Sequence, residues 1–428
     1  MNRLMSLLLM GLIATAAQAA ELPATEFDEM YADVAGYALD PKHSPDLAHG
    51  VVEIEYGDAK AYLPAWVYAR DRLPGDQPAE FEFQIARAMH QRYRQSFETI
   101  QEHPFKIFQD LNAAMDAAIG IEGILRAYEH DHSEDYRRVA QNYLHFAQPL
   151  AKHPGLLMAY HMQPYGPATV LAGGAWFYLE YALAVGPADP DHDAYERLGL
   201  SIIEKMDRKL YSEKNHAYRY SCRPGYDFVY VYDNAVMVQA LVRAYVLTGE
   251  RRYYERAVSI MKALEQALDH PDYGGFLAAE DNPRYCRQYE KVGPQYNREY
   301  MALSAHNYLV YAYLTLYEAG GFQDEELLAR AAKCLRFERD RLWDRHGKIQ
   351  HHLERGKISD PKDYCMGCNF QTLYHIVQYK AALLKIPTQG LSPATSHHLK
   401  LELLPQGVGG RQPAGEGTQD NPKLQVLK

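Results

Sequence analysis

One acidic corner in the middle of the chain offers the clearest chemistry. Residues 226–250 read YDFVYVYDNAVMVQALVRAYVLTGE, in which an alternating aromatic run ends at Asp233 and a helical pattern follows. A carboxylate at a helix N-terminus is stabilised in its charged form by the helix dipole and free N–H groups. Such a group suits a general base or a nucleophile better than a general acid, whose pKa must be raised. The structural alternative is a helix N-cap, where Asp is a preferred residue.

Hydrolysis of a glycosidic bond needs a second carboxyl group across the sugar ring from the first. The possible partners of Asp233 lie on an expected helix, in the aromatic run or after the DYGGF turn: Asp116, Asp227 and Asp281. Glu280, next to Asp281, is an equivalent choice. Each of these carboxyl groups alone is typical of a solvated surface charge. The sequence therefore does not select the pair.

A second set of residues suits chemistry on acidic sugars. Removal of a proton next to a carboxylate needs a Tyr or His base and a cation that holds the acid group. The loop YHMQPYG supplies His161 and Tyr165, and other regions supply Arg223, Arg298 and His306. A lone histidine is more often structural, so each residue alone indicates little. Together they keep a uronate lyase or epimerase as an alternative.

Aromatic residues around the acidic corner suit a cleft that binds sugars. The chain holds 35 Tyr against 3 Trp and 13 Phe, and tyrosine joins an apolar face to a hydroxyl group. Further candidate substrate contacts are Trp176, Tyr230, Tyr232, Asn234 and Tyr273. For Trp176, which follows a Gly-Gly pair inside a helical pattern, core packing is the favoured alternative.

The N-terminus and the composition narrow the class of protein. Residues 1–20 are typical of a signal peptide, with Arg3 ahead of an apolar run and Ala17-Gln18-Ala19 as the cleavage site. That apolar run is too short to span a membrane, so we expect a periplasmic or secreted chain. A formal net charge of −10 argues against nucleic acid as a partner. No phosphate-loop, dinucleotide or nucleophile-elbow motif is present, and we expect no cofactor.

The five cysteines are expected to experience an oxidising compartment. Cys334 lies in a helical pattern and should be a buried free thiol. The other four lie in loop-like text shortly before a helix: Cys222, Cys286, Cys365 and Cys368. We expect disulfides among these four and no metal. A zinc site that includes His351 or His352 is the alternative.

Pairs of helices joined by tight turns must position these residues. First helices are expected to begin near residues 111, 171, 233, 299 and 369, and they are apolar and rich in small residues. Second helices carry the charges, as expected for the inner and outer shells of a helical barrel. Polar turns with a few alternating residues follow the second helices and predict short β-hairpins on one rim. A further helix is expected over residues 79–100, and residues 21–75 ahead of it should be irregular.

Five or six hairpins that close on themselves form an all-α (α/α) toroid. The chain resembles the six-hairpin glycosidase-like superfamily over roughly residues 80–390. The motifs that carry this resemblance are YDNA at 232–235, DYGGF at 272–276 and LWDRHGK at 342–348. Members of that superfamily include glycoside hydrolases, polysaccharide lyases, sugar 2-epimerases and a domain of glucuronyl C5-epimerases. The resemblance implies the architecture more than any one activity.

We expect residues 21–390 to form the toroid and residues 391–428, which lack periodicity, to be a disordered tail. The leading hypothesis is an exported glycoside hydrolase that acts on an envelope or extracellular polysaccharide. The first alternative is a uronate-directed polysaccharide lyase or a glucuronyl C5-epimerase-like enzyme. The second is a non-catalytic glycan-binding or secretion-scaffold protein. The sequence selects neither the glycan nor the oligomeric state.

Overall fold

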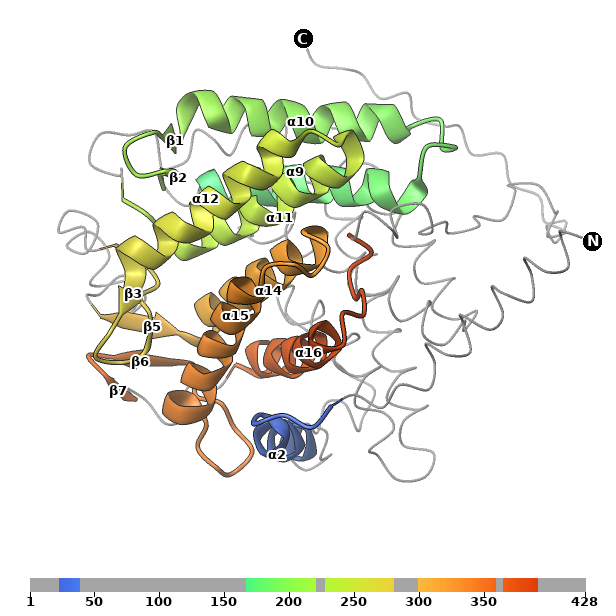
Figure 1. Cartoon of the computed structure of the whole chain (residues 1–428). Coiled ribbons are helices and arrows are strands. Elements are labelled where there is room, and N and C mark those ends of the chain that lie inside the picture. Colours follow the sequence, from blue (N-terminus) through green and yellow to red (C-terminus); the bar gives the residue numbers. More distant parts are fainter. Residues whose placement is uncertain (1–22, 39–166, 221–227, 281–298, 359–364, 392–428) are drawn as a thin grey trace, which may run out of the picture.

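The computed structural model describes residues 23–38, 167–220, 228–280, 299–358 and 365–391. Within these stretches, helical hairpins follow one another along the chain (Figure 1). The pairs are α9 (Pro167–Val185) with α10 (His192–Lys209), α11 (Val231–Thr248) with α12 (Arg251–Leu268), and α14 (Leu303–Ala319) with α15 (Glu325–Phe337). A π-helical turn, η5 (Glu338–Leu342), extends α15, and α16 (Met366–Leu383) follows. The helix pairs predicted for this part of the chain are confirmed.

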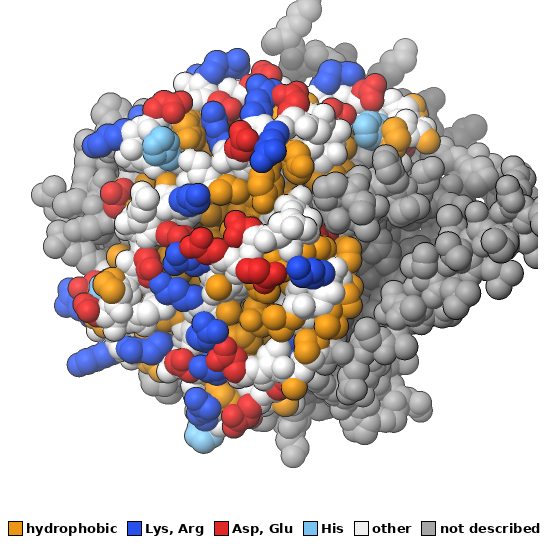
Figure 2. All heavy atoms as spheres, in the orientation of Figure 1, with side chains coloured by type: hydrophobic (Ala, Val, Ile, Leu, Met, Phe, Trp, Pro, Cys, Tyr) orange, Lys and Arg blue, Asp and Glu red, His pale blue; other side chains and the backbone are white. Residues whose placement is uncertain are grey.

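The first helices of the pairs form an inner layer, and the second helices cover it. α9 packs against α11, α11 against α14 and α14 against α16, while α10, α12 and α15 each pack on the preceding inner helix. From Val231 to Ala244 every side chain of α11 except Tyr232 is buried, as expected for a helix enclosed on all sides. Figure 2 shows acidic and basic side chains interspersed over the outer helices. The fold is therefore an all-α (α/α) toroid.

Short β-hairpins follow the outer helices on one rim, as predicted. The first joins β1 (Tyr211–Ser212) to β2 (Ala217–Tyr218), and the second joins β3 (Asp269–His270) to β4 (Gly275–Phe276). A three-stranded sheet contains β5 (Tyr300–Ala302), β6 (His352–Glu354) and β7 (Lys357–Ile358) in that order. Glycine is required in β4, because a Cβ atom at Gly275 would overlap the Phe337 ring.

Glycine also terminates the inner helix of the second pair. Gly249 follows Thr248 with a φ of 72°, and its N–H donates to the Tyr245 carbonyl. Left-handed backbone at this position is the usual end of a helix and favours glycine. The chain reverses there within two residues and α12 begins at Arg251. This is the turn that the sequence predicts.

In the first turns of an inner helix, one buried polar side chain hydrogen-bonds to the backbone of the rim segment beside it, which is the hairpin or loop that precedes the helix. We call such a side chain a rim clamp. In α11, Asn234 Nδ2 donates to the carbonyls of Tyr230 and Tyr218, each at 3.0 Å. Its Oδ1 accepts from the Tyr218 N–H at 2.8 Å. Asn234 is fully buried, so these bonds satisfy both ends of its amide where water is absent.

The same clamp recurs in α16. Asn369 Nδ2 donates to the carbonyls of Cys365 and Ile349 at 2.9 and 3.0 Å, and Oδ1 accepts from the Ile349 N–H at 2.8 Å. In both helices the clamp donates to the residue four positions before it and pairs with one residue of the neighbouring rim segment. The rim is therefore attached to the inner helices by repeated side-chain contacts.

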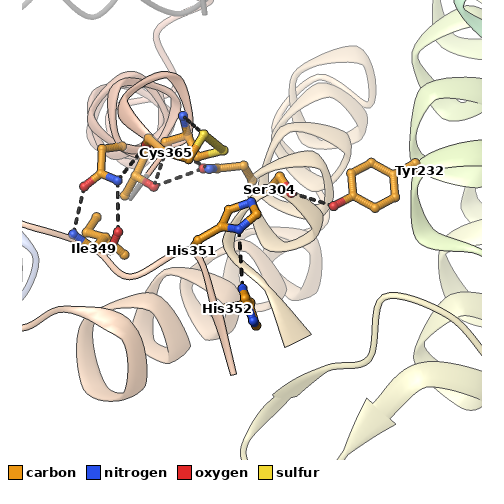
Figure 3. The surroundings of a disulfide bond; sticks show 10 residues. Tyr232, Ser304, Ile349, His351, His352 and Cys365 are labelled. Carbon is orange, nitrogen blue, oxygen red and sulfur yellow. Dashed lines mark hydrogen bonds between the residues drawn. A yellow bond between two sulfur atoms is a disulfide. The ribbon is translucent and has the colours of Figure 1, made fainter. Parts of the chain in front are cut away.

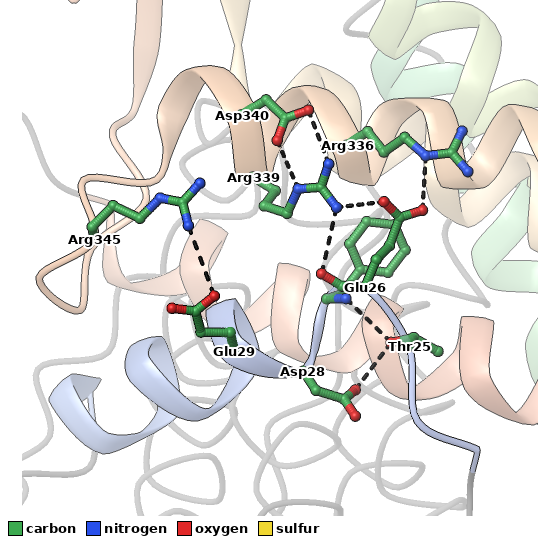
Figure 4. Close-up of polar contacts among 9 residues, drawn as sticks. Thr25, Glu26, Asp28, Glu29, Arg336, Arg339, Asp340 and Arg345 are labelled. Atoms are coloured by element: carbon green, nitrogen blue, oxygen red, sulfur yellow. Dashed lines mark hydrogen bonds and ion pairs between the residues drawn. The ribbon is translucent and has the colours of Figure 1, made fainter.

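The N-terminal segment closes onto the C-terminal hairpins. Helix α2 (Asp28–Ala38) packs against α16. Just before it, the Glu26 carboxylate pairs with Arg336 and Arg339 (Figure 4). Within it, Asp33 Oδ2 accepts from Trp343 Nε1 at 2.8 Å. Residues more than 300 positions apart in the sequence thus lie in contact.

Helix α2 is a correction to the sequence analysis, which expected irregular structure over residues 21–75. The expectation is wrong for Asp28–Ala38. Four buried apolar side chains at helical spacing face the core there: Phe27, Met30, Tyr31 and Val34. A segment this short depends on tertiary packing rather than on its own helix propensity. That packing is not visible in the local pattern.

Several expectations fall outside the described residues. These are the signal peptide, the helix over residues 79–100, the hairpin that begins near residue 111 and the tail from residue 392 onward. The domain boundaries stay predictions. Within the described part of the chain, no helix is both long enough and apolar enough to cross a membrane.

The clamp makes a direct prediction for stability. Substitution Asn369→Ala should lower the free energy of unfolding by about 3 kcal/mol, because the buried polar groups of Ile349 and Cys365 lose their partners. Denaturant titration of the two proteins measures the difference. The control is Gln323→Ala, at an exposed position, where a change within about 0.5 kcal/mol is expected. Equal effects of the two substitutions would contradict the role of the clamp.

Candidate functional site

The starts of the inner helices meet at the rim that carries the hairpins. Thr169 in the first turn of α9 donates through its hydroxyl to Asp233 of α11. The hydroxyl groups of Tyr232 and Ser304 lie 2.5 Å apart and join the starts of α11 and α14. Asn307 of α14 donates to a backbone carbonyl in the first turn of α16 at 2.9 Å. The expected convergence of helix starts is therefore present for α9, α11, α14 and α16.

Asp233 lies at this convergence, but in a different state from the one expected. Helix α11 begins at Val231 with Tyr230 as its N-cap residue, so Asp233 is the third helical residue and not the cap. The side chain is fully buried. Among the described residues, Asp233 Oδ2 has no hydrogen-bond partner. The N-cap alternative is therefore wrong for the helix as it stands.

Burial raises the pKa of Asp233 well above its usual value, and the hydrogen bond from Thr169 opposes this rise only in part. The sequence analysis expected the helix dipole to keep the carboxylate charged. Loss of solvation outweighs that dipole here, since burial of an ionised carboxyl costs far more free energy than a helix dipole contributes. A protonated Asp233 suits a general acid, whereas a charged one suits a base or a nucleophile. The expectation of a charged carboxylate is corrected accordingly.

Three tyrosines form an aromatic cluster at the starts of α11 and α14. The ring of Tyr232 lies 5.0 Å from that of Tyr230 and 5.5 Å from that of Tyr308. Tyr230 and Tyr232 are half-buried, whereas Tyr308 is buried. Half-buried tyrosines offer an apolar face and a hydroxyl group to a ligand at the same time. The candidate contacts Tyr230 and Tyr232 therefore lie together at the inner-helix starts.

One exposed carboxylate lies just after the β3–β4 hairpin, on a segment that pairs with the residues leading into α11. Glu280 follows Ala279, which pairs with Tyr230 in an antiparallel bridge. Its Oε2 accepts from the Val229 N–H at 3.1 Å, and its own N–H donates to the Val229 carbonyl at 2.9 Å. The side chain is thus held against the segment that leads into α11. Its neighbour Asp281 lies outside the described residues.

Two other aromatic candidates lie elsewhere. Trp176 is fully buried in α9, where its Nε1 donates to Glu180 at 3.3 Å and its ring lies 5.4 Å from the Arg243 guanidinium. Arg243 in turn pairs with Glu180 at 2.6 Å. Tyr273 stacks on His270 in the turn of the β3–β4 hairpin. Trp176 therefore belongs to the buried core, which is the alternative that the sequence favours for it.

His306 acts as the rim clamp of α14. Its Nδ1 lies 2.8 Å from the Ala302 carbonyl and its Nε2 accepts from the Phe276 N–H at 2.9 Å. The ring also stacks on Phe337 at 4.1 Å. Burial lowers the pKa of His306 to about 4, so the neutral ring carries its proton on Nδ1. Both ring nitrogens are hydrogen-bonded to backbone groups, and so is the side-chain amide of Asn234.

The remaining candidates lie outside the described residues: Asp116, Asp227, Asp281, His161, Tyr165, Arg223 and Arg298. The sequence analysis did not select Thr169, Ser304 or Tyr308, which complete the group around Asp233 and Tyr232. Alignment of the inner helices on their first residues would have placed Thr169 and Ser304 in the same turn as Asp233. No local motif marks either of them.

A second perturbed acid lies deeper, between α15 and α16. Glu338 of η5 is fully buried, and Thr372 donates to it at 3.0 Å. Burial raises its pKa to about 8. The Thr372 hydroxyl oxygen also lies 3.2 Å from the Asn307 side-chain oxygen, and His375 Nδ1 lies 3.1 Å from that same oxygen. This polar chain connects the interior to the start of α16, and the sequence analysis did not identify it.

The cysteines confirm part of the prediction, which was a free thiol at Cys334 and disulfides among the other four. Cys334 is a buried free thiol in α15, and burial raises its pKa well above the usual value. Cys365 and Cys368 form a disulfide with each other, with a Cα–Cα distance of 5.3 Å. Cys222 and Cys286 lie outside the described residues. A disulfide at the start of α16 is thus present, although its two cysteines are separated by only two residues.

Comparison with known proteins identifies the fold of the chain but assigns it to no family. No protein-family model and no curated protein sequence matches the chain. An unsaturated glucuronyl hydrolase from Bacillus sp. GL1, described as responsible for the degradation of glycosaminoglycan, has a TM-score of 0.54 at 13% identity. The alignment covers 81% of this chain and 96% of that one.

Two mannanases show the same likeness. An inactive variant of an α-1,6-mannanase from Salegentibacter sp., in complex with α-1,6-mannotriose, has a TM-score of 0.52 at 13% identity over 83% of this chain and 99% of its own. An α-mannanase from Bacteroides thetaiotaomicron has a TM-score of 0.50 at 9% identity over 77% and 87% of the two chains. Likeness at this identity shows the (α/α) toroid fold alone and no activity.

The His306 clamp predicts a loss of stability in acid. Because its pKa is about 4 in the folded chain against the usual 6.5, its contribution is complete above pH 6.5 and disappears as the pH falls toward 4. The shift is equivalent to about 3 kcal/mol. Denaturant titrations between pH 7 and pH 4 should show a shallower decline for His306→Gln than for the wild type. Parallel declines in both proteins would contradict the assignment.

Proposed function

We propose that this chain is an exported glycoside hydrolase in which Asp233 is the general acid. The observation that carries the proposal is a fully buried carboxyl group at the convergence of the inner-helix starts, where burial raises its pKa well above the usual value. Protonation of the leaving oxygen is the step that glycoside hydrolysis requires of such a group. The α/α toroid, whose known structures include a glucuronyl hydrolase and mannanases, supports the class of enzyme.

The surroundings of Asp233 suit an acid that releases its proton only to a bound ligand. Thr169 holds one carboxyl oxygen, and the other has no described partner. Full burial means that the covering side chains must move before a glycosidic oxygen can approach. The half-buried Tyr230 and Tyr232 lie next to this position, and their hydroxyl and ring surfaces suit the polar and C–H faces of a sugar.

Glu280 is the described carboxylate best placed for the second role. The hairpin that holds it is paired with Tyr230 at the start of α11, and the side chain is exposed. A carboxylate that solvent and a ligand can reach can act as a base or a nucleophile. Asp116, Asp227 and Asp281 stay candidates for this role as well. The spacing between the two carboxyl groups decides whether the anomeric configuration is retained or inverted.

The uronate alternative loses one of its residues, because His306 uses both ring nitrogens for backbone contacts.

The proposed reaction is tested by incubation of the purified protein with neutral and uronate-rich polysaccharides. New reducing ends without ultraviolet absorbance are expected for hydrolysis. Absorbance from an unsaturated uronate would show a lyase, and exchange of the C5 hydrogen with solvent would show an epimerase. Binding without any product would favour a glycan-binding or scaffold protein.

Substitution Asp233→Asn should abolish turnover and leave the fold intact. The amide oxygen can still accept from Thr169, and the amide does not titrate. In the wild type, the folded state retains a proton that the unfolded state loses above its usual pKa of 3.8. Stability of the wild type relative to the variant should therefore fall as the pH rises above 3.8.

Activity assays and denaturant titrations at pH 4 and pH 7 measure both effects. The matched control is Glu326→Gln, on an exposed carboxyl of α15 away from the rim, which should leave turnover unchanged. Survival of activity in Asp233→Asn would remove this residue from the mechanism.

Export is a separate part of the proposal and has its own test. Cell fractionation of a bacterial host that expresses the full chain should recover the protein in the periplasm or the medium. Mass spectrometry should show that the N-terminal 20 residues are missing, as cleavage of a signal peptide requires. An intact N-terminus in the cytoplasmic fraction would overturn this prediction.

A further inference from the structure

Three side chains with metal-binding atoms gather where α16 begins. Cys365 is the N-cap residue of α16, Cys368 lies in its first turn, and His351 immediately precedes β6. One ligand atom from each residue lies within 4.8 Å of the other two. Two cysteines separated by two residues are the usual half of a zinc site, and a histidine from another segment is a usual third ligand.

The backbone around these side chains is held in place from two sides. The His351 carbonyl accepts from the Leu303 N–H at the start of α14, at 2.8 Å. Asn369 clamps Ile349 to the first turn of α16. Figure 3 shows His351, Cys365 and Ile349 in the surroundings of the disulfide bond. The segment that carries the histidine and the helix that carries the cysteines are therefore fixed relative to each other before any ligand binds.

The start of α16 also favours charged sulfur. Cys365 Sγ accepts from the Cys368 N–H at 3.1 Å, and free N–H groups at a helix start stabilise a thiolate. Two thiolates would balance the charge of a divalent cation, and a neutral imidazole would add no further charge. Sulfur and imidazole ligands select zinc over magnesium and calcium, which prefer oxygen.

We propose that Cys365, Cys368 and His351 bind one zinc ion when the two cysteines are in the dithiol form. The structure holds the disulfide, so the site requires a dithiol reductant. That reductant supplies two electrons and two protons to the Cys365–Cys368 bond and is itself oxidised to a disulfide. Zinc then binds to both sulfur atoms as their two protons pass to solvent. The disulfide and the metal therefore exclude each other.

This site is separate from the catalytic proposal and does not depend on it. It lies on the same rim, because α14 links the starts of α11 and α16 through Ser304 and Asn307. Tetrahedral zinc takes four ligands, and these three residues supply three of them. The start of α16 would thus exist in two forms, the disulfide and the zinc-bound dithiolate. A dithiol reductant and zinc together would convert the first form into the second.

The test measures metal binding and not turnover. The full chain is reduced with dithiothreitol, freed of the reductant and of metal under anaerobic conditions, and titrated with zinc chloride. One zinc per chain is expected in the reduced protein and none in the oxidised protein. Zinc should raise the melting temperature of the reduced protein alone, since a ligand of the folded state stabilises it. Absence of stoichiometric zinc in the reduced protein would overturn the proposal.

Variants assign the ligands. Substitutions Cys365→Ser, Cys368→Ser and His351→Gln should each weaken zinc binding at least about tenfold, as loss of a ligand predicts. The matched controls are Cys334→Ala, on the buried thiol of α15, and His346→Gln, on an exposed histidine near the same strand. Both controls should bind zinc like the wild type. Circular dichroism confirms that each variant is folded, and equal zinc affinity in the ligand variants and the controls would refute the site.

Discussion

The attachment of the rim to the inner helices is the contact on which the rest of the structure depends. Asn234, His306 and Asn369 each bind the carbonyl four residues before them and a backbone group of the adjacent rim segment. Each is buried, so its polar atoms must be paired within the protein. This requirement fixes where each hairpin lies relative to its helix. The helix starts can present Asp233, Tyr232 and Ser304 to one another because the segments around them cannot shift.

The fold could be predicted from the sequence largely because its signals are local. The apolar composition of α11, the glycine at 249 and the charged stripe of α12 each identify an element without knowledge of its neighbours. Helix α2 could not be predicted in this way, since its apolar residues obtain their stability from α16, more than 300 residues away. The motifs that carried the resemblance are mainly architectural. Gly275 of DYGGF makes room for Phe337, and Asn234 of YDNA is a clamp.

The position of Asp233 at a helix start could be predicted from the sequence, but the shift of its pKa could not. The switch from alternating to helical pattern placed Asp233 at a helix start, and that placement is confirmed. Its protonation depends on burial by residues from several helices, which no local pattern contains. The same limit applies to His306, whose spacing relative to Asn234 and Asn369 is meaningful only once the helix starts are aligned. For Trp176 the local pattern was sufficient. The preceding Gly-Gly pair favoured a place in the core, and the side chain lies there beside Arg243.

The contact between the N-terminal segment and the C-terminal helices has a consequence for the order in which the chain folds. Lys380 of α16 bonds to Asp28 of α2 at 2.9 Å, and both arginine partners of Glu26 lie beyond residue 330. Contacts between such distant parts of a chain form late, because the intervening loop must first be ordered. A ribosome-bound chain in which α16 has not yet been synthesised therefore lacks the helix that α2 packs against. Helix α2 is therefore synthesised early but can dock only after the last described helix has been made.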